Sequence, residues 1–355
     1  VDAKSQAEKR TFSHFVVPRF TRMRLPDAKG IQDMYAGVVE NENRNELLVT
    51  DTLNLIQEGR TPILLTERKE HAALLASRLS DKVKNVFLLI GSDKQKEKRE
   101  KMAALQNVPD DEDVVVVATG KYIGEGFDSP RLDTLLLAMP ISWKGTLAQY
   151  AGRLHRNYEG KHEVRIYDYV DIHVPTLERM YHKRLKGYAE LGYQVKFGAA
   201  DKSISTIYDG HAAMGSFEQD LIDAARSIVI VSPYLQKARI VKLLSLLQQA
   251  FDSGVGIVIH TKGSDNYDSQ KQESVREAIS MIEQVGITVH AHKELQQRYA
   301  IIDESIVWYG SVVFLAFGRK DTDVLRFENS DIAGELLAIS EEANGEQLMI
   351  EDIPT

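Results

Sequence analysis

Two arginines lie three residues apart in the stretch QYAGRLHR, residues 149–156 of the chain. On a helix, Arg153 and Arg156 would project from the same side, because residues three apart are neighbours on its surface. Two guanidinium groups without an adjacent carboxylate repel each other unless an anion lies between them. A phosphate suits this role, and an arginine that reaches a transferring phosphoryl group accelerates its transfer by about 10³ to 10⁵. The pair therefore predicts a phosphate-binding site, and the alternative is a pair of surface arginines.

A second polar stretch, residues 118–133, follows an apolar run of strand type. Gly126 permits close approach of the backbone to a ligand. The carboxylate of Asp128 can accept a hydrogen bond from a ribose hydroxyl. Hydroxyls, backbone amides and cations that suit a nucleic-acid backbone come from Thr66, Arg68, Thr119, Gly120 and Lys121. Such contacts position a strand without reading its sequence.

These polar stretches interrupt an alternation of apolar strands and amphipathic helices. The apolar runs occupy residues 61–66, 86–91, 113–120, 132–140 and 164–170. Strands this uniformly apolar, separated by helices, indicate a parallel sheet that is covered on both faces. We therefore predict a doubly wound α/β domain whose polar loops lie at the carboxyl ends of strands, where open α/β sheets bind ligands.

Three stretches resemble the motifs of superfamily 2 helicases of the DEAD/DEAH type, in the order found in their second RecA-like lobe. Residues 119–128, T-G-K-x-x-x-E-G-F-D, resemble motif V, and residues 149–156, Q-x-x-G-R-x-x-R, resemble motif VI. Residues 64–79 resemble motif IV and its helix. The resemblance implies that Arg156 is an arginine finger and that Arg153 contacts the γ-phosphate of ATP. It implies that the same ATP-binding cleft contains Gly126, Asp128 and Gln149.

The phosphate-binding loop G-x-x-x-x-G-K-[ST] does not occur in this sequence. The resemblance assigns that loop and the Mg²⁺ ligands to the first lobe, so ATP and Mg²⁺ are the expected cofactors of a site that this chain only half supplies. We expect residues 1–40 to be a crossing segment from a missing N-terminal lobe, and residues 41–197 to form the second lobe. Alone, the chain is expected to hydrolyse no ATP. A partner subunit that supplies the first lobe is the alternative.

The C-terminal part carries a weaker resemblance. Residues 198–214 are small and polar enough for a linker, and residues 215–340 resemble one half of the phospholipase D fold, an α/β domain with the signature H-x-K-x₄-D-x₆-G-S-x-N. Its chemical positions are held here by Gln296, Arg298, Asp303 and Ser311. An amide replaces the histidine nucleophile and cannot form a covalent phosphoryl intermediate. We therefore predict a degenerate site that binds phosphate through Arg298 and Ser311, or else a packing or oligomerisation domain.

Composition narrows the remaining classes. The 355 residues contain no cysteine, which excludes disulfides and thiolate zinc sites, and we predict no metal site. With a net charge of −8, nucleic acid would have to bind in a local groove rather than on a broadly basic surface. No apolar run is long enough to span a bilayer, so we expect a cytoplasmic protein without membrane contact. Residues 341–355 are expected to form a solvated acidic tail.

The sequence as a whole predicts the C-terminal part of a nucleic-acid-dependent ATPase, a helicase or translocase. One alternative is a nuclease that acts through the phospholipase D-like domain, which Gln296 disfavours. Another is a non-enzymatic nucleic-acid-binding module, which the paired arginines disfavour. A helicase lobe joined to a phospholipase D-like domain resembles restriction- or defence-associated bacterial helicases, which makes DNA the expected partner. RNA, the direction of movement and the oligomeric state are left open.

Overall fold

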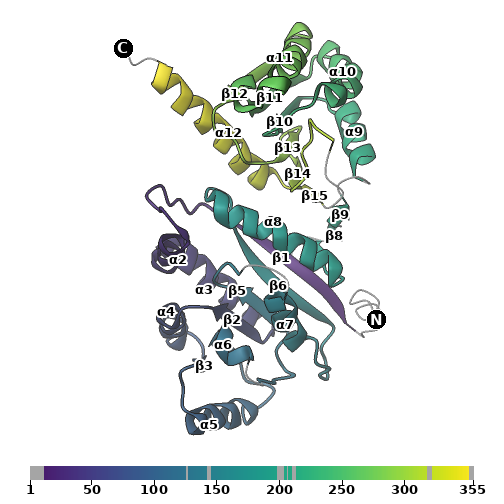
Figure 1. The fold of residues 1–355 in the computed structure, drawn as a ribbon. Helices are drawn as coiled ribbons and strands as arrows, with labels where there is room; N and C mark the ends of the chain where they lie inside the picture. Colours follow the sequence, from purple (N-terminus) through teal and green to yellow (C-terminus); the bar gives the residue numbers. More distant parts are fainter. Residues whose placement is uncertain are drawn as a thin grey trace. The chain divides into compact units, whose positions relative to one another are not determined.

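The computed structural model describes residues 12–124, 127–141, 145–197, 204–205, 207–209, 213–317 and 322–351 (Figure 1). Internal contacts divide the chain into two compact units, residues 1–204 and residues 205–355. The division falls within the segment predicted as a linker. Each unit is an α/β structure with its own sheet, as the sequence predicted.

Unit 1 is built on an eight-stranded sheet with the strand order β3-β4-β2-β5-β6-β1-β7-β8. Neighbouring strands from β3 to β7 in this order are parallel. The strands are β1 Ser13–Thr21, β2 Pro62–Thr66, β3 Asn85–Leu89, β4 Val114–Thr119, β5 Thr134–Leu137, β6 Glu163–Asp171, β7 Gln194–Lys196 and β8 Ile204–Ser205. Every residue of β2 and β4 is buried, which explains why these strands read as continuous apolar runs.

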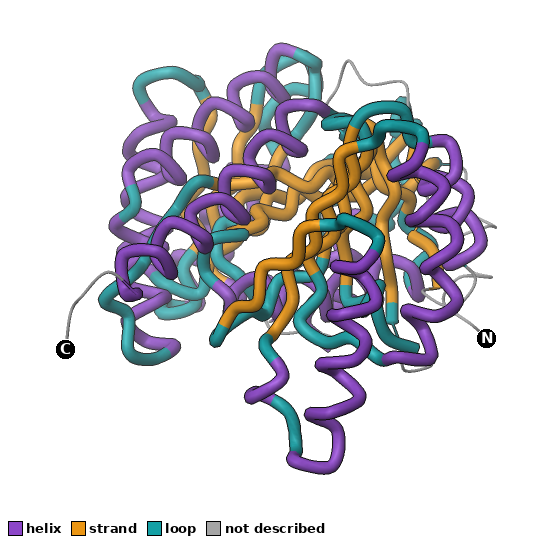
Figure 2. The backbone as a smooth tube through the Cα atoms, turned by 90° about the horizontal axis from the view of Figure 1, so that it is seen from above, coloured by secondary structure: helices purple, strands orange, loops and turns teal. Residues whose placement is uncertain are grey.

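Helices cover both faces of this sheet (Figure 2). They are α2 Ile31–Glu40, α3 Glu42–Gln57, α4 Lys69–Ser80, α5 Gln95–Gln106, α6 Gly120–Gly124, α7 Gly145–Leu154 and α8 Pro175–Glu190. Tyr167 and Tyr169 of β6 pack in one core with α3 and α4, whereas Asp168 between them binds Arg184 of α8. Because successive residues of a strand face opposite sides, the two sets of helices lie on opposite faces. This is the doubly wound arrangement that the sequence predicted.

The N-terminal segment has a different place from the one predicted for it. Residues 13–21, expected to cross from another lobe, form β1, which pairs with β6 along nine residues and also with β7. Phe15, Val16 and Val17 are buried, so the apolar character of the segment comes from its position inside the sheet. The helices α2 and α3 follow it directly.

Unit 2 has a seven-stranded mixed sheet with the order β12-β11-β10-β13-β14-β15-β9. The strands are β9 Ile207–Asp209, β10 Ser227–Val231, β11 Gly256–Lys262, β12 Thr288–His292, β13 Tyr299–Ile302, β14 Ile306–Gly310 and β15 Asp323–Glu328. Strands β10, β11 and β12 are parallel, and the remaining pairs are antiparallel. The helices are α9 Met214–Asp223, α10 Lys237–Asp252, α11 Ser269–Gln284 and α12 Ser330–Glu351, with a 3-10 turn at Ser264–Asn266.

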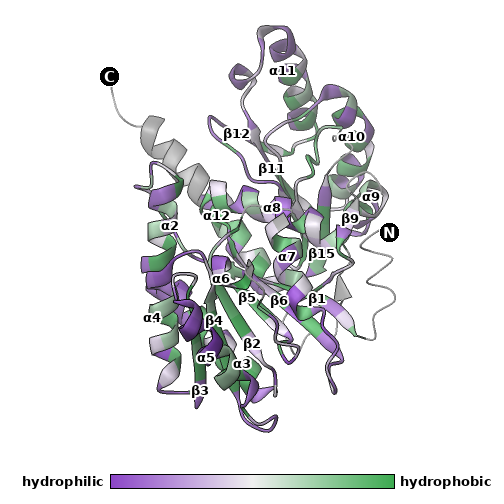
Figure 3. Cartoon of the chain, turned by 60° about the horizontal axis from the view of Figure 1, so that its bottom comes forward, coloured by the Kyte–Doolittle hydropathy of each residue, from purple (hydrophilic) through white to green (hydrophobic). Residues whose placement is uncertain are grey.

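Hydropathy follows this division into strands and helices (Figure 3). The core strands of both units are apolar, whereas the first half of α5, QKEKREK, is entirely polar, as expected for a solvated helix. Residues 341–351, predicted as part of an acidic tail, continue α12 instead. Within the described part of the chain, no helix is both long and apolar enough to cross a membrane.

Candidate functional site

The candidate nucleic-acid residues of unit 1 meet at the carboxyl ends of two adjacent strands. Thr66 of β2 and Thr119 of β4 are partners in the parallel register, so both strands end at the same edge of the sheet. The residues that follow them, Arg68 on one side and Gly120 with Lys121 on the other, therefore leave the sheet side by side. Lys121 is exposed, and no ion pair is recorded for it among the described residues. The hydroxyl of Thr119 accepts a hydrogen bond from the backbone of Gly91 at 2.9 Å.

Thr66 does not have the role predicted for it. Its side chain is buried, with 1% of the residue exposed, and its hydroxyl accepts a hydrogen bond from the backbone amide of Arg68. The same hydroxyl lies 3.1 Å from Nδ1 of His71, whose Nε2 lies 2.8 Å from Oδ1 of Asn45. Since that amide oxygen only accepts, Nε2 of His71 donates to it and Nδ1 accepts from Thr66. The hydroxyl thus fixes the start of α4 and cannot reach a nucleic acid.

A buried tyrosine connects this edge to the arginine helix. Tyr150 of α7 donates a hydrogen bond from its hydroxyl to Oε1 of Glu67 at 3.0 Å. A Cβ atom on Gly120 would collide with both groups, so a larger residue here would displace the ends of the Tyr150 and Glu67 side chains. Burial and the Glu67 carboxylate raise the pKa of Tyr150. Neither Glu67 nor Tyr150 was predicted from the sequence, because each contacts another motif segment and neither occupies a position expected to bind a ligand.

The two arginines are arranged differently from the prediction. Arg153 lies in the last turn of α7, but the helix ends at Leu154, so Arg156 lies beyond it in the turn that leads to β6. Arg156 also has an adjacent carboxylate, because its Nε lies 3.2 Å from Oδ1 of Asp128. Both side chains are about half exposed, at 54% and 50%. An ion pair this exposed contributes about 0 to 1 kcal/mol, so an incoming anion can replace the carboxylate.

The remaining predicted nucleotide residues are placed as follows. Nε of Arg153 is buried and has no hydrogen-bond partner within the described ranges. Gln149 is exposed on α7. A Cβ atom on Gly152, next to Arg153, would meet nothing within 4 Å. Gly126 lies outside the described residues. Unit 1 thus brings Asp128 and Arg156 together, and Arg153, three residues before Arg156, keeps a guanidinium nitrogen unsatisfied among the described residues.

In unit 2, two of the predicted phosphate ligands lie together but one has another function. Arg298 precedes β13 and Ser311 follows β14, and these antiparallel strands bring Nη1 of Arg298 to 3.5 Å from the carbonyl of Ser311. The hydroxyl of Ser311, however, accepts from the backbone amide of Asp323 at 3.0 Å and donates to the carbonyl of Asp323 at 3.3 Å. Gly310 is required here, because a Cβ would collide with the backbone of β15. The Gly-Ser pair therefore attaches β14 to β15.

Asp303 does not belong to the candidate phosphate site, contrary to the prediction. It follows β13, at the opposite end of the strand from Arg298. Its carboxylate accepts hydrogen bonds of 2.7 to 3.2 Å from the backbone amides of residues 225–227. Burial raises its pKa, but these hydrogen bonds and Arg226 outweigh that effect, so the pKa of Asp303 lies below its ordinary value. The carboxylate of Asp303 therefore serves the fold rather than a phosphate site.

The edge of unit 2 that carries Arg298 also carries side chains that the sequence did not single out. Val231 of β10 is paired with His260 of β11 on one side and with Tyr299 of β13 on the other. The segments after β10 and β11 therefore lie at the same edge of the sheet as the segment before β13. Tyr234, after β10, is 43% exposed, and Nζ of Lys262 lies 5.0 Å from the centre of its ring. Gln296 is exposed close by in the sequence.

A buried histidine pair lies on β11 and β12. Nδ1 of His260 is 3.0 Å from Nε2 of His292, and the two rings are stacked at 5.2 Å. Burial, followed by the neighbouring His292 and His290, lowers the pKa of His260 to about 3. Among the residues that the structure describes, no group of three or more His, Cys, Asp or Glu side chains is arranged to hold a metal ion.

Sequence comparison finds two viral relatives of the chain, and no protein-family model matches it. Over 165 residues, the chain is 33% identical to the putative helicase 161L of Invertebrate iridescent virus 6, which covers 44% of this chain and 35% of that protein. The chain thus spans about a third of the length of that relative. Over 90 residues, it is 37% identical to the uncharacterized protein 108L of Invertebrate iridescent virus 3, covering 25% of this chain and 82% of that protein.

Solved structures give slighter similarities. The T4 UvsW structure matches with a TM-score of 0.42 and 16% identity, covering 56% of this chain and 42% of that one. The DEAD-box protein SrmB of E. coli matches with a TM-score of 0.38 and 17% identity, covering 55% and 97%. The phospholipase D family member Nuc from Salmonella typhimurium matches with a TM-score of 0.33 and 15% identity, covering 40% and 92%. At these TM-scores, only the sequence relatives and the chain's own residues support a function.

Proposed function

We propose that this chain is the second RecA-like lobe and an accessory domain of a nucleic-acid-dependent ATPase of the helicase or translocase type. The chain belongs to the same family as the uncharacterized protein 108L of Invertebrate iridescent virus 3. The observation that carries the proposal is the convergence of three distant segments. Glu67 of the first binds Tyr150 of the third across Gly120 of the second. The 33% identity to a putative helicase supports the same reading.

The arginines of unit 1 suit the phosphates of ATP. Nε of Arg153 is a buried donor without an acceptor among the residues that the structure describes, and the open side of Gly152 leaves room beside it. Arg156 is held by an exposed carboxylate that a phosphate oxygen can displace, because a phosphate carries more charge than Asp128. In this proposal, Arg156 stabilises negative charge that develops on the transferring phosphoryl group. Gln149 would contact the same nucleotide, and a first lobe would supply the Mg²⁺ ligands.

Arg68 and Lys121 would hold the nucleic-acid backbone at the carboxyl edge of the sheet. Thr119 is buried and its hydroxyl is bonded to the amide of Gly91, and Gly120 is also buried, so these two residues would shape the edge rather than contact the strand. The cations and backbone amides at this edge contact phosphates, which carry no sequence information. Such contacts suit a protein that moves along a strand, and DNA is the partner that we propose. The Glu67–Tyr150 bond would connect this edge to the helix that carries Arg153.

Joining a first RecA-like lobe to this chain and measuring ATP hydrolysis tests the proposal. We expect DNA to stimulate turnover at least about tenfold in the two-lobe protein, whereas the chain alone hydrolyses no ATP. Turnover by the purified chain alone, or a correctly folded two-lobe protein that DNA does not stimulate, would contradict the proposal.

Unit 2 favours a second function, nucleic-acid binding without cleavage. Tyr234 presents a ring on which a base can stack, and Lys262 and Arg298 supply cations at the same edge. Gln296 has no nucleophilic nitrogen, and the hydroxyl of Ser311 is bonded to β15. We therefore assign to unit 2 a role in holding a strand rather than in cutting it.

A further inference from the structure

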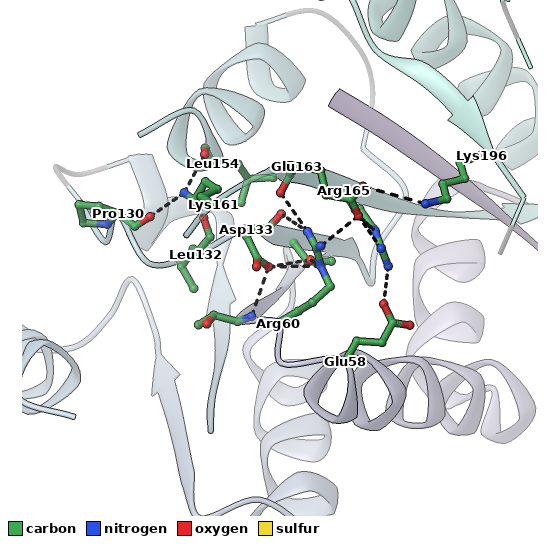
Figure 4. Close-up of polar contacts among 12 residues, drawn as sticks. Glu58, Arg60, Pro130, Leu132, Asp133, Leu154, Lys161, Glu163, Arg165 and Lys196 are labelled. Carbon is green, nitrogen blue, oxygen red and sulfur yellow. Dashed lines mark hydrogen bonds and ion pairs between the residues drawn. The ribbon is translucent and has the colours of Figure 1, made fainter. Parts of the chain in front are cut away.

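The ammonium group of Lys161 binds backbone carbonyls of both segments that carry Asp128 and Arg156. Lys161 lies in the connection between α7 and β6, and its Nζ contacts four carbonyl oxygens, of which those of Pro130, Leu132 and Leu154 can be followed in Figure 4. These belong to Pro130 at 2.6 Å, Leu132 at 2.7 Å, Arg156 at 2.9 Å and Leu154 at 3.1 Å. An ammonium has three N–H donors and no acceptor, so four carbonyl oxygens use all of its capacity for hydrogen bonds.

The carbonyls come equally from the two segments. Pro130 and Leu132 follow Asp128 within four residues, and Leu154 and Arg156 belong to the end of the arginine stretch. Besides the carbonyls around Lys161, the exposed Asp128–Arg156 pair joins these two segments. That pair alone contributes about 0 to 1 kcal/mol. Because α7 ends at Leu154, helix geometry does not fix Arg156 either.

A network of ion pairs lies next to the Lys161 carbonyls, at the amino ends of three strands (Figure 4). Arg60, just before β2, donates to the carbonyls of Asp133 and Glu163, each at 3.2 Å. Asp133 directly precedes β5 and Glu163 begins β6, so this guanidinium joins both connections to the sheet. Leu132 and Lys161 are one and two residues from these anchored positions. The carbonyls around Lys161 are therefore attached to a rigid support.

We infer that Lys161 is a positioning residue that fixes Arg156 relative to Asp128, and so sets the place of the arginine in the nucleotide site. This inference rests on the proposed function of Arg156. An arginine at position 161 would not substitute, because a planar guanidinium cannot replace a compact ammonium among four converging carbonyls. Lys161 acts only through the backbone of these two segments.

Hydrogen exchange of the full chain tests the structural part of the inference. In Lys161→Met, peptides that cover residues 128–133 and 154–160 should exchange at least about tenfold faster than in the parent. Lys196→Met is the matched control, because Lys196 is also a lysine of this sheet near Glu163, at 4.0 Å, and its contacts among the described residues are this carboxylate and the ring of Phe15 rather than backbone carbonyls. Equal exchange in the parent and Lys161→Met, or equal acceleration in both variants, would overturn the inference.

Turnover of the two-lobe protein tests the functional part. Lys161→Met and Lys161→Arg should lower kcat by about 10- to 100-fold and leave KM for ATP within about threefold. A misplaced arginine still allows ATP to bind, but it stabilises the transition state less. Added ethylammonium should restore part of kcat in Lys161→Ala, which a general loss of folding would not allow. An unchanged kcat in Lys161→Met would overturn the inference. If the parent showed no turnover, the proposed function would be refuted. The hydrogen-exchange result would still test the structural part of the inference by itself.

Discussion

The two units of this chain use similar motif spacing for different purposes. In unit 1, the edge of the sheet leaves Lys121 exposed, and Arg156 is paired with an exposed carboxylate. In unit 2, Asp303 caps three backbone amides and Ser311 attaches β14 to β15. Packing alone thus explains the aspartate and the Gly-Ser pair of unit 2. Motif spacing therefore indicates chemistry only where the side chains remain available for a ligand.

The largest expected effect concerns Arg156. In the two-lobe protein, Arg156→Ala should lower ATP turnover by about 10³ while affinity for DNA stays within a few-fold, because this arginine acts on the transferring phosphoryl group. Steady-state hydrolysis and fluorescence anisotropy with labelled DNA would measure the two quantities. Arg179→Ala, an exposed arginine on α8, is the control and should leave both near the parent values. Turnover within a few-fold of the parent in Arg156→Ala would make Arg156 a surface charge.

Regular structure was the part of the molecule that the sequence predicted well. The uniformly apolar runs, such as VVVVAT of β4, specify buried parallel strands because no polar face remains for solvent. The prediction failed for β1, because an apolar segment before the first helix carries no local sign of which sheet it joins. It also failed for Thr66 and Asp303, because their partners lie in the tertiary structure.

The candidate site shows the same limit at the level of single residues. Arg153, Arg156 and Asp128 were found by type and spacing, but the end of α7 before Arg156 was not. Lys161 escaped notice because its partners are backbone carbonyls, which have no sequence signature. Likewise, nothing local to Gly120 reveals that Tyr150 and Glu67 occupy the space where its Cβ would lie.

Two glycines of unit 1 allow a matched test of that packing. Gly120→Ala should lower the free energy of unfolding by about 1 to 3 kcal/mol, because the added methyl collides with Tyr150 and Glu67. Gly152→Ala should raise it by about 0.5 to 1 kcal/mol, because the position is helical and has open space. Urea denaturation of the full chain measures both changes. Equal effects of the two substitutions would show that the three motif segments do not pack closely.

The binding role of unit 2 predicts a smaller effect. Tyr234→Ala should weaken binding of a short single-stranded oligonucleotide by the full chain about tenfold, because one stacked base contributes about 1 to 3 kcal/mol. Arg298→Ala should weaken it and also reduce the dependence on salt, because one phosphate contact is lost. Ile222→Ala, an exposed apolar residue of α9, is the control. Reproducible cleavage of the oligonucleotide that Arg298→Ala abolishes would restore the nuclease alternative.

Acid should affect both units, through one buried histidine in each. Burial disfavours the charged form of a histidine ring, and it is the main cause that lowers the pKa of His71 and of His260 to about 3. Between pH 6.5 and pH 3 the unfolded chain therefore binds protons that the folded chain does not, so the free energy of unfolding falls as the pH decreases. By pH 5.5 the loss should be about 1 kcal/mol for each histidine. Urea denaturation at pH 7.5 and 5.5 measures this loss. His71→Gln keeps a donor for Asn45 and should reduce it, whereas an unchanged loss would mean that burial does not hold His71 neutral.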